Sequence, residues 1–136
     1  MEMTGRCLCG SITYTCSAEP IVTGVCHCTD CQRQTGAAAS ILVGVPAGTL
    51  RVVGHTLSSF VTIGDVHGTR TNRFFCSGCG SPIVSRIDAM PDVEFIKAGT
   101  LDDRAWLEPS VEFYTRSAQP WMPPIPGAQR LETVPS

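Results

Sequence analysis

The sequence predicts a single all-β domain, and three observations support this prediction. The length of 136 residues suits one domain with a substantial hydrophobic core. The segments between turn signals are short and rich in β-branched residues, as strands are. Helical periodicity is weak, and many short strands at this spacing are typical of antiparallel sheets.

The first expected strand shows the alternation most clearly, because Ile12, Tyr14 and Cys16 fall on one face. Gly- and Pro-containing breakers separate the later strands, and the segment from Gly64 to Gly68 has the composition of a hairpin loop. The expected strands cover residues 11–16, 21–25, 40–45, 50–53, 57–63, 69–75, 83–87, 93–98 and 111–114. We also expect Phe60, Phe74 and Phe75 to lie in the core.

One short helix is expected over residues 29–35. Cys28 or Thr29 lies near its N-cap position, and Gly36 is suited to end it. This places the helix directly after a dense group of cysteines in the middle of the chain.

The C-terminal tail, residues 119–136, is rich in proline and can neither continue a helix nor pair as a central strand. We expect it to follow the surface, with Trp121 as an anchor. No domain boundary is visible within residues 1–118, so residues 1–136 are expected to form one domain.

Charge and hydropathy exclude several classes of protein as first hypotheses. The formal net charge is −2, and Lys97 is the single lysine, which argues against a polybasic nucleic-acid or anionic-membrane binder. No apolar run approaches the length of a membrane span. The N-terminus lacks the apolar region of a secretory signal, so we expect a cytoplasmic protein without nucleic-acid or membrane partners.

Eight cysteines in such a chain point to metal binding, because thiols in a reducing compartment remain reduced. Disulfides require a secreted context, and the familiar ferredoxin runs of iron–sulfur proteins are absent. Zinc is therefore the expected metal. Seven of the cysteines form three groups: Cys7 and Cys9; Cys26, Cys28 and Cys31; Cys76 and Cys79.

The number of ligands suggests how these groups divide. A structural zinc site has four protein ligands, whereas a catalytic site has three and one open position. The economical partition joins the first and third groups into a closed site and leaves the C-x-C-x-x-C group, residues 26–31, as an open site. Spacing alone also permits other pairings or one shared cluster.

Four segments together point to a known family: GRCLCGSITY at 5–14, VCHCTDCQRQTG at 25–36, RFFCSGCGSP at 73–82 and AGTLD at 98–102. In order and spacing they resemble the glutathione-dependent formaldehyde-activating family, from residue 5 to about residue 121. The resemblance implies a β-tent fold and two zinc ions, with Cys7, Cys9, Cys76 and Cys79 structural and Cys26, Cys28 and Cys31 at the active zinc. The reaction it implies is the condensation of glutathione with formaldehyde to S-hydroxymethylglutathione. Long insertions that would build a dedicated glutathione pocket are missing.

Two hypotheses for function follow. The first is a carbon–sulfur lyase or synthase, in which a thiol such as glutathione completes the open zinc shell and joins formaldehyde or another small aldehyde. A site with three thiolates favours a soft sulfur ligand over oxygen. The second is a non-catalytic zinc module that binds a thiol or protein partner, or whose vacancy is closed by Cys16. Burial as a small apolar residue is the simpler expectation for Cys16.

Other side chains near the motifs have more than one interpretation. His27 lies between two ligands, and its side chain should point away from the metal. Arg33, one turn after Cys31, is a candidate to bind an anionic group such as a glutathione carboxylate, and Arg73 has the same ambiguity between this role and an exposed face. Asp30 is expected to cap the short helix or to shuttle a proton.

His55 and His67 lie in loop contexts and are expected to be solvated. Leu101 and Trp106 are expected in the core.

Overall fold

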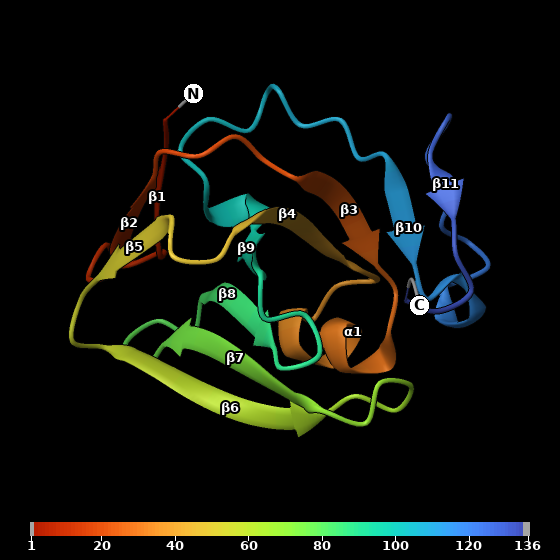
Figure 1. Ribbon diagram of the computed structural model, residues 1–136, viewed down its shortest axis with the longest axis horizontal. Coiled ribbons are helices and arrows are strands. Elements are labelled where there is room, and N and C mark those ends of the chain that lie inside the picture. Colours follow the sequence, from red (N-terminus) through yellow and green to blue (C-terminus); the bar gives the residue numbers. More distant parts are fainter. Residues whose placement is uncertain (1, 135–136) are drawn as a thin grey trace.

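The computed structural model describes residues 2–134, and strands dominate it (Figure 1). A small sheet has the strand order β1-β2-β5, and a large sheet has the order β11-β10-β3-β4-β9-β8-β7-β6. The strands of the small sheet are β1 (Met3–Arg6), β2 (Thr13–Cys16) and β5 (Leu50–Val53). Those of the large sheet are β3 (Val22–Cys26), β4 (Ser40–Pro46), β6 (Leu57–Ile63), β7 (Arg70–Cys76), β8 (Pro82–Ile87), β9 (Val93–Lys97), β10 (Val111–Phe113) and β11 (Gln129–Arg130).

The predicted all-β fold with one short helix is confirmed. Most strand pairs are antiparallel, but β10 pairs in parallel with β3 and β11. Two strands were not predicted. β1 offers only Met3 as a large apolar residue, and β11 lies within the Pro-rich tail.

Helix α1 (Thr29–Thr35) has the bounds that the sequence predicts. The Cys28 side chain caps it by accepting a hydrogen bond from the Cys31 backbone N–H, and Gly36 ends it in the left-handed conformation. Figure 1 shows α1 between the β6–β7 hairpin and the strands β3 and β4. This placement brings residues of α1 against β7, which matters for the site. Two 3-10 helices, η1 (Ala98–Thr100) and η2 (Thr115–Ser117), complete the elements.

The buried residues form two clusters. The larger one packs the small sheet against the large sheet and includes Ile12, Tyr14, Ile83 and Ile96. Cys16 is buried in this cluster, as expected for a small apolar residue. Its sulfur lies 3.5 Å from the Thr49 hydroxyl oxygen. The second cluster includes Cys26, Cys31, Leu42, Phe95 and Tyr114.

Three aromatic predictions have different outcomes. Phe60 and Trp121 are exposed, at 66% and 72%, so neither the core position of Phe60 nor the anchor role of Trp121 holds. Phe60 lies on β6, the last strand of the large sheet, which has a neighbour on one side only. Trp106 packs against the larger cluster and donates its indole N–H to the Asp103 carbonyl, as a core-edge residue would.

The tail is held by hydrogen bonds rather than by an aromatic anchor. β11 pairs with β10, and the Ile125 N–H and the Arg130 guanidinium both donate to the Glu112 carboxylate. Residues 135–136 of the predicted tail lie outside the described part of the chain. No helix among the described residues is long and apolar enough to cross a membrane.

Candidate metal centres and the pocket beside them

The two cysteine groups come together as the economical partition predicted. The sulfurs of Cys7, Cys9, Cys76 and Cys79 lie within 4.8 Å of one another, and those of Cys26, Cys28 and Cys31 form a second group within the same limit. All eight cysteines are free. The first group joins a loop after β1 to the end of β7 and the turn that follows it, whereas the second spans residues 26–31, from the end of β3 into α1.

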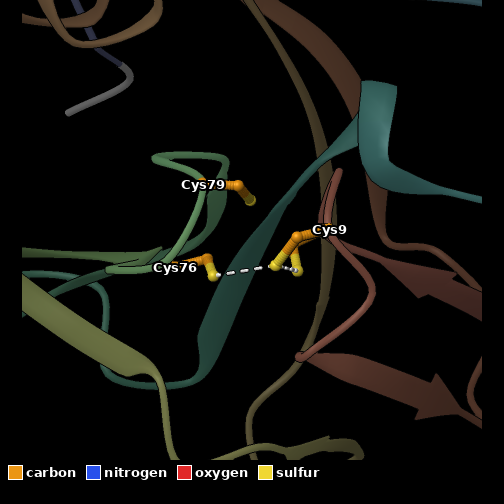
Figure 2. Close-up of side chains that lie close together, drawn as sticks. Cys9, Cys76 and Cys79 are labelled. Atoms are coloured by element: carbon orange, nitrogen blue, oxygen red, sulfur yellow. Dashed lines mark hydrogen bonds between the residues drawn. The ribbon is translucent and has the colours of Figure 1, made fainter.

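The four-sulfur group fits a zinc ion. Figure 2 shows Cys9, Cys76 and Cys79 converging from these two loops. The sulfur of Cys9 lies 3.7 Å from that of Cys7 and 3.8 Å from that of Cys76. Four sulfurs placed tetrahedrally at about 2.3 Å from zinc would be about 3.8 Å apart, so the spacing suits this metal.

Hydroxyl groups support the sulfurs of this closed group. The Cys76 sulfur lies 3.3 Å from the Ser11 hydroxyl and 3.4 Å from the Thr56 hydroxyl. Their hydrogen bonds lower the pKa of Cys76 to about 5. The Ser81 hydroxyl, 3.3 Å from the Cys79 sulfur, lowers the pKa of Cys79 to about 7. These contacts favour thiolates, the form that binds metal.

The three-sulfur group has a different environment, because it opens onto a cavity. Cys26 and Cys31 are buried, Cys28 is half-buried, and all three line a cavity of about 280 Å³. Among the described residues, no fourth His, Cys, Asp or Glu ligand atom joins this group. Cys16 lies in the larger core cluster instead, so it does not close the site.

Two buried cations stand at the sulfur end of the cavity. Arg73 on β7 donates to the Cys31 sulfur over 3.6 Å and to the Gln34 side chain over 3.2 Å. Lys97 on β9 is 4% exposed and donates to the Ser40 hydroxyl over 3.0 Å. Both side chains line the cavity. The structure thus brings the single lysine of the chain to the three cysteines.

These charges and the sulfurs act on one another. Hydrogen bonds from Cys26 and Cys28, with the positive charges of Lys97 and Arg73, hold the pKa of Cys31 far below its ordinary value. The neighbouring sulfurs and burial raise the pKa of Cys26. Burial lowers the pKa of Lys97, although the nearby sulfurs act in the opposite direction. Three thiolates this close together repel one another, so a bound cation would be needed for all three cysteines to be ionised.

His27 points away from the sulfurs, as predicted. Its Nε2 lies 2.8 Å from a carboxylate oxygen of Glu112, and both side chains are buried. Glu112 also accepts from Arg130, so this network ties the cysteine turn to β10 and the tail. His27 is a supporting residue of the turn.

The other candidate residues are distributed around the cavity. Asp30 and His67 line it, and His67 hydrogen-bonds to the Thr69 hydroxyl over 2.7 Å. Arg33 is exposed on α1 and is not among the lining residues. His55 is exposed.

Sequence reasoning did not assign Lys97 to the site and left Arg73 undecided. The sequence offers one signal for Lys97: it follows Phe95 and Ile96 in a strand, and a lysine that is buried there must be paired.

Comparison with known proteins agrees with this geometry. A family model described as glutathione-dependent formaldehyde-activating enzyme matches residues 2–117. The chain belongs to this family. The present member of the glutathione-dependent formaldehyde-activating family is similar in structure to a Rhodobacter sphaeroides protein whose crystal structure is known. The TM-score is 0.58 and the sequence identity is 21%. The match covers 79% of this chain and 92% of that one, and it shows a shared fold.

Proposed function

We propose that this protein joins a thiol to formaldehyde or another small aldehyde, or cleaves the resulting adduct, at the Cys26–Cys28–Cys31 site. One observation carries the proposal: three convergent sulfurs open onto a cavity, and no fourth protein ligand accompanies them among the described residues. Structural metal sites are closed, whereas sites that handle substrate keep a position free.

The proposed metal is zinc, with one ion in each cysteine group. Thiolate donors and the sulfur spacing of the closed group suit zinc. Zinc at the open group would supply a coordination position that favours the deprotonated form of a substrate thiol.

Residues of the chain would favour an anionic sulfur at this place. Arg73 and Lys97 bring two positive charges to the sulfur end of the cavity. Three thiolates and one divalent ion carry a net charge of −1, so the two cations make this end net positive. A thiolate that enters is then balanced by the chain's own side chains.

The reaction needs few groups. A carbon–sulfur bond forms between the thiol sulfur and the aldehyde carbon, the π electrons of the carbonyl move to oxygen, and the thiol proton ends on that oxygen. The Lys97 ammonium has three N–H donors, and one of them donates to the Ser40 hydroxyl. Another would donate a hydrogen bond to the aldehyde oxygen, on which negative charge develops during the reaction. The buried walls hold both reactants close together.

Glutathione is the first thiol to test, because the family is glutathione-dependent. Arg33 is the proposed contact for a glutathione carboxylate. Its exposed position on α1 requires the tripeptide to extend out of the cavity.

The test is the rate of adduct formation from thiol and formaldehyde, followed by exchange NMR with zinc-loaded protein and compared with the uncatalysed rate. We expect acceleration that Cys28→Ser abolishes and Cys16→Ser preserves, because Cys16 belongs to the core and to neither sulfur group. No acceleration with any thiol would refute the proposal. Thiol binding without acceleration would favour a non-catalytic module.

A further inference from the structure

Much of the cavity wall is apolar. The apolar part is formed by side chains from several elements, including Ile63, Ile87, Met90, Phe95, Phe113 and Val134. Five of these six lie in or packed against the second core cluster, so they are fixed parts of the fold. A small ligand whose sulfur reaches the cysteines places the rest of its body against this surface, whereas a longer one such as glutathione would also extend out of the cavity.

The two buried cations of the cavity lie at its sulfur end. Arg73 uses its Nε on the Thr62 hydroxyl and its Nη1 on Cys31 and Gln34. Lys97 is bound to Ser40 and lies deep in the fold. Arg73 and Lys97 contribute a charge of +2, and three thiolates with a divalent ion contribute −1. A substrate thiolate that binds brings the sum to zero, so no positive charge remains for a second anionic group.

No further basic side chain except His67 lines the cavity among the described residues. The other charged lining residues are acidic. Asp30 and Asp65 are exposed, and Asp65 forms an ion pair with Arg116 over 2.7 Å, so the charge of Arg116 is already balanced. The remaining polar lining groups are hydroxyls, such as that of Ser85, which can donate a hydrogen bond but cannot neutralise a charge. A carboxylate on the ligand would therefore lack a counter-ion in the cavity wall, which is unfavourable.

We propose that the thiol accepted by this pocket has a small, uncharged and apolar body, in contrast to the ionised ends of glutathione. This inference rests on the proposed function, since it assumes that a thiol completes the three-sulfur site. It narrows the substrate class: apolar alkyl or aryl thiols, and their hydroxymethyl adducts, fit both the wall chemistry and the charge balance.

The experiment measures binding rather than turnover. Cobalt(II) replaces zinc, and the sulfur-to-cobalt charge-transfer band reports a fourth thiolate at the open group. Dissociation constants are measured for two matched pairs: 1-propanethiol against 3-mercaptopropionate, and the dimethyl ester of glutathione against glutathione. The first pair keeps the three-carbon chain and the second keeps the tripeptide, and both pairs change the number of carboxylates.

We expect 1-propanethiol to bind about tenfold or more tightly than 3-mercaptopropionate, and the ester to bind more tightly than glutathione. Equal or tighter binding of the carboxylate-bearing thiols overturns this inference and leaves the proposed function standing. If no thiol changes the spectrum, the proposed function fails and this inference fails with it.

A variant adds a second readout. Met90→Lys places a cation in the apolar wall and should reverse the preference within the first pair. Val61→Lys is the matched control, because Val61 is exposed on β6 and does not line the cavity. A reversal in both variants, or in neither, counts against the pocket assignment. If Met90→Lys does not fold, the thiol pairs on the native chain still decide.

Discussion

Replacing Glu112 with Gln tests how the buried network supports the cysteine turn. The carboxylate accepts hydrogen bonds from His27 Nε2 on one oxygen and from the Ile125 N–H and Arg130 on the other. A glutamine has one oxygen, so its NH2 group must face one of these two sides. If it faces His27, the ring proton moves to Nδ1, which is buried without a partner.

The cost follows from these contacts. Losing a charge-assisted hydrogen bond and leaving one buried polar group unpaired lowers the free energy of unfolding by about 2–4 kcal/mol. For a chain of this length, 1 kcal/mol corresponds to about 3–4 °C, so the melting temperature should fall by about 6–16 °C. Calorimetry of the metal-loaded protein at pH 7 measures the change. Glu132→Gln is the control, because Glu132 is exposed on the same tail.

The pH dependence gives an independent check. Burial raises the pKa of Glu112, but the hydrogen bonds from His27, Ile125 and Arg130 outweigh it, and the pKa lies below its ordinary value. The stabilising contribution is complete above the unfolded pKa of about 4.3 and is lost as the pH falls through the folded pKa. The gap between native chain and variant should narrow below about pH 4. A melting temperature within about 2 °C of the native one at pH 7, or a gap unchanged down to pH 3, would refute the reasoning.

Three further outcomes are expected. Gly5→Ala places a Cβ that overlaps the Tyr14 ring and should lower the free energy of unfolding by about 1–3 kcal/mol in urea titrations. Gly99→Ala, where nothing lies within 4 Å, should change it by less than about 0.5 kcal/mol, and equal effects would contradict the close-approach argument. Cys76→Ser should lose one metal equivalent by elemental analysis and melt at a lower temperature, as chelator-treated protein should; full metal content would exclude the four-sulfur site. Trp121→Ala should leave the melting temperature nearly unchanged, because the indole is exposed.

Local signals in the sequence were sufficient for most of the fold. Breakers set the bounds of β5, β6 and α1 as predicted. They missed β1 and β11, whose pairing depends on partners distant in sequence rather than on their own alternation. The exposure of Phe60 was not predictable either, because alternation does not show which strand lies at a sheet edge.

The candidate site, like the fold, was predictable from the sequence only in part. Ligand chemistry and spacing predicted both cysteine groups, because zinc imposes a small set of ligand numbers. The two buried cations of the site were not predicted from local sequence. Arg73 reaches Cys31 because β7 lies beside α1, and Lys97 reaches the cavity because β9 pairs with β4. Such placement depends on register and layer packing, which one sequence does not specify.

The two cysteine groups differ in when they can assemble during synthesis. The ligands of the open group are all present once residue 31 has left the ribosome, whereas the closed group must wait for residue 79. The turn that lines the cavity is therefore the first of the two groups in which all ligand atoms are present. If each group takes an ion as proposed, the group that fastens β1 to β7 would be the second one to be completed.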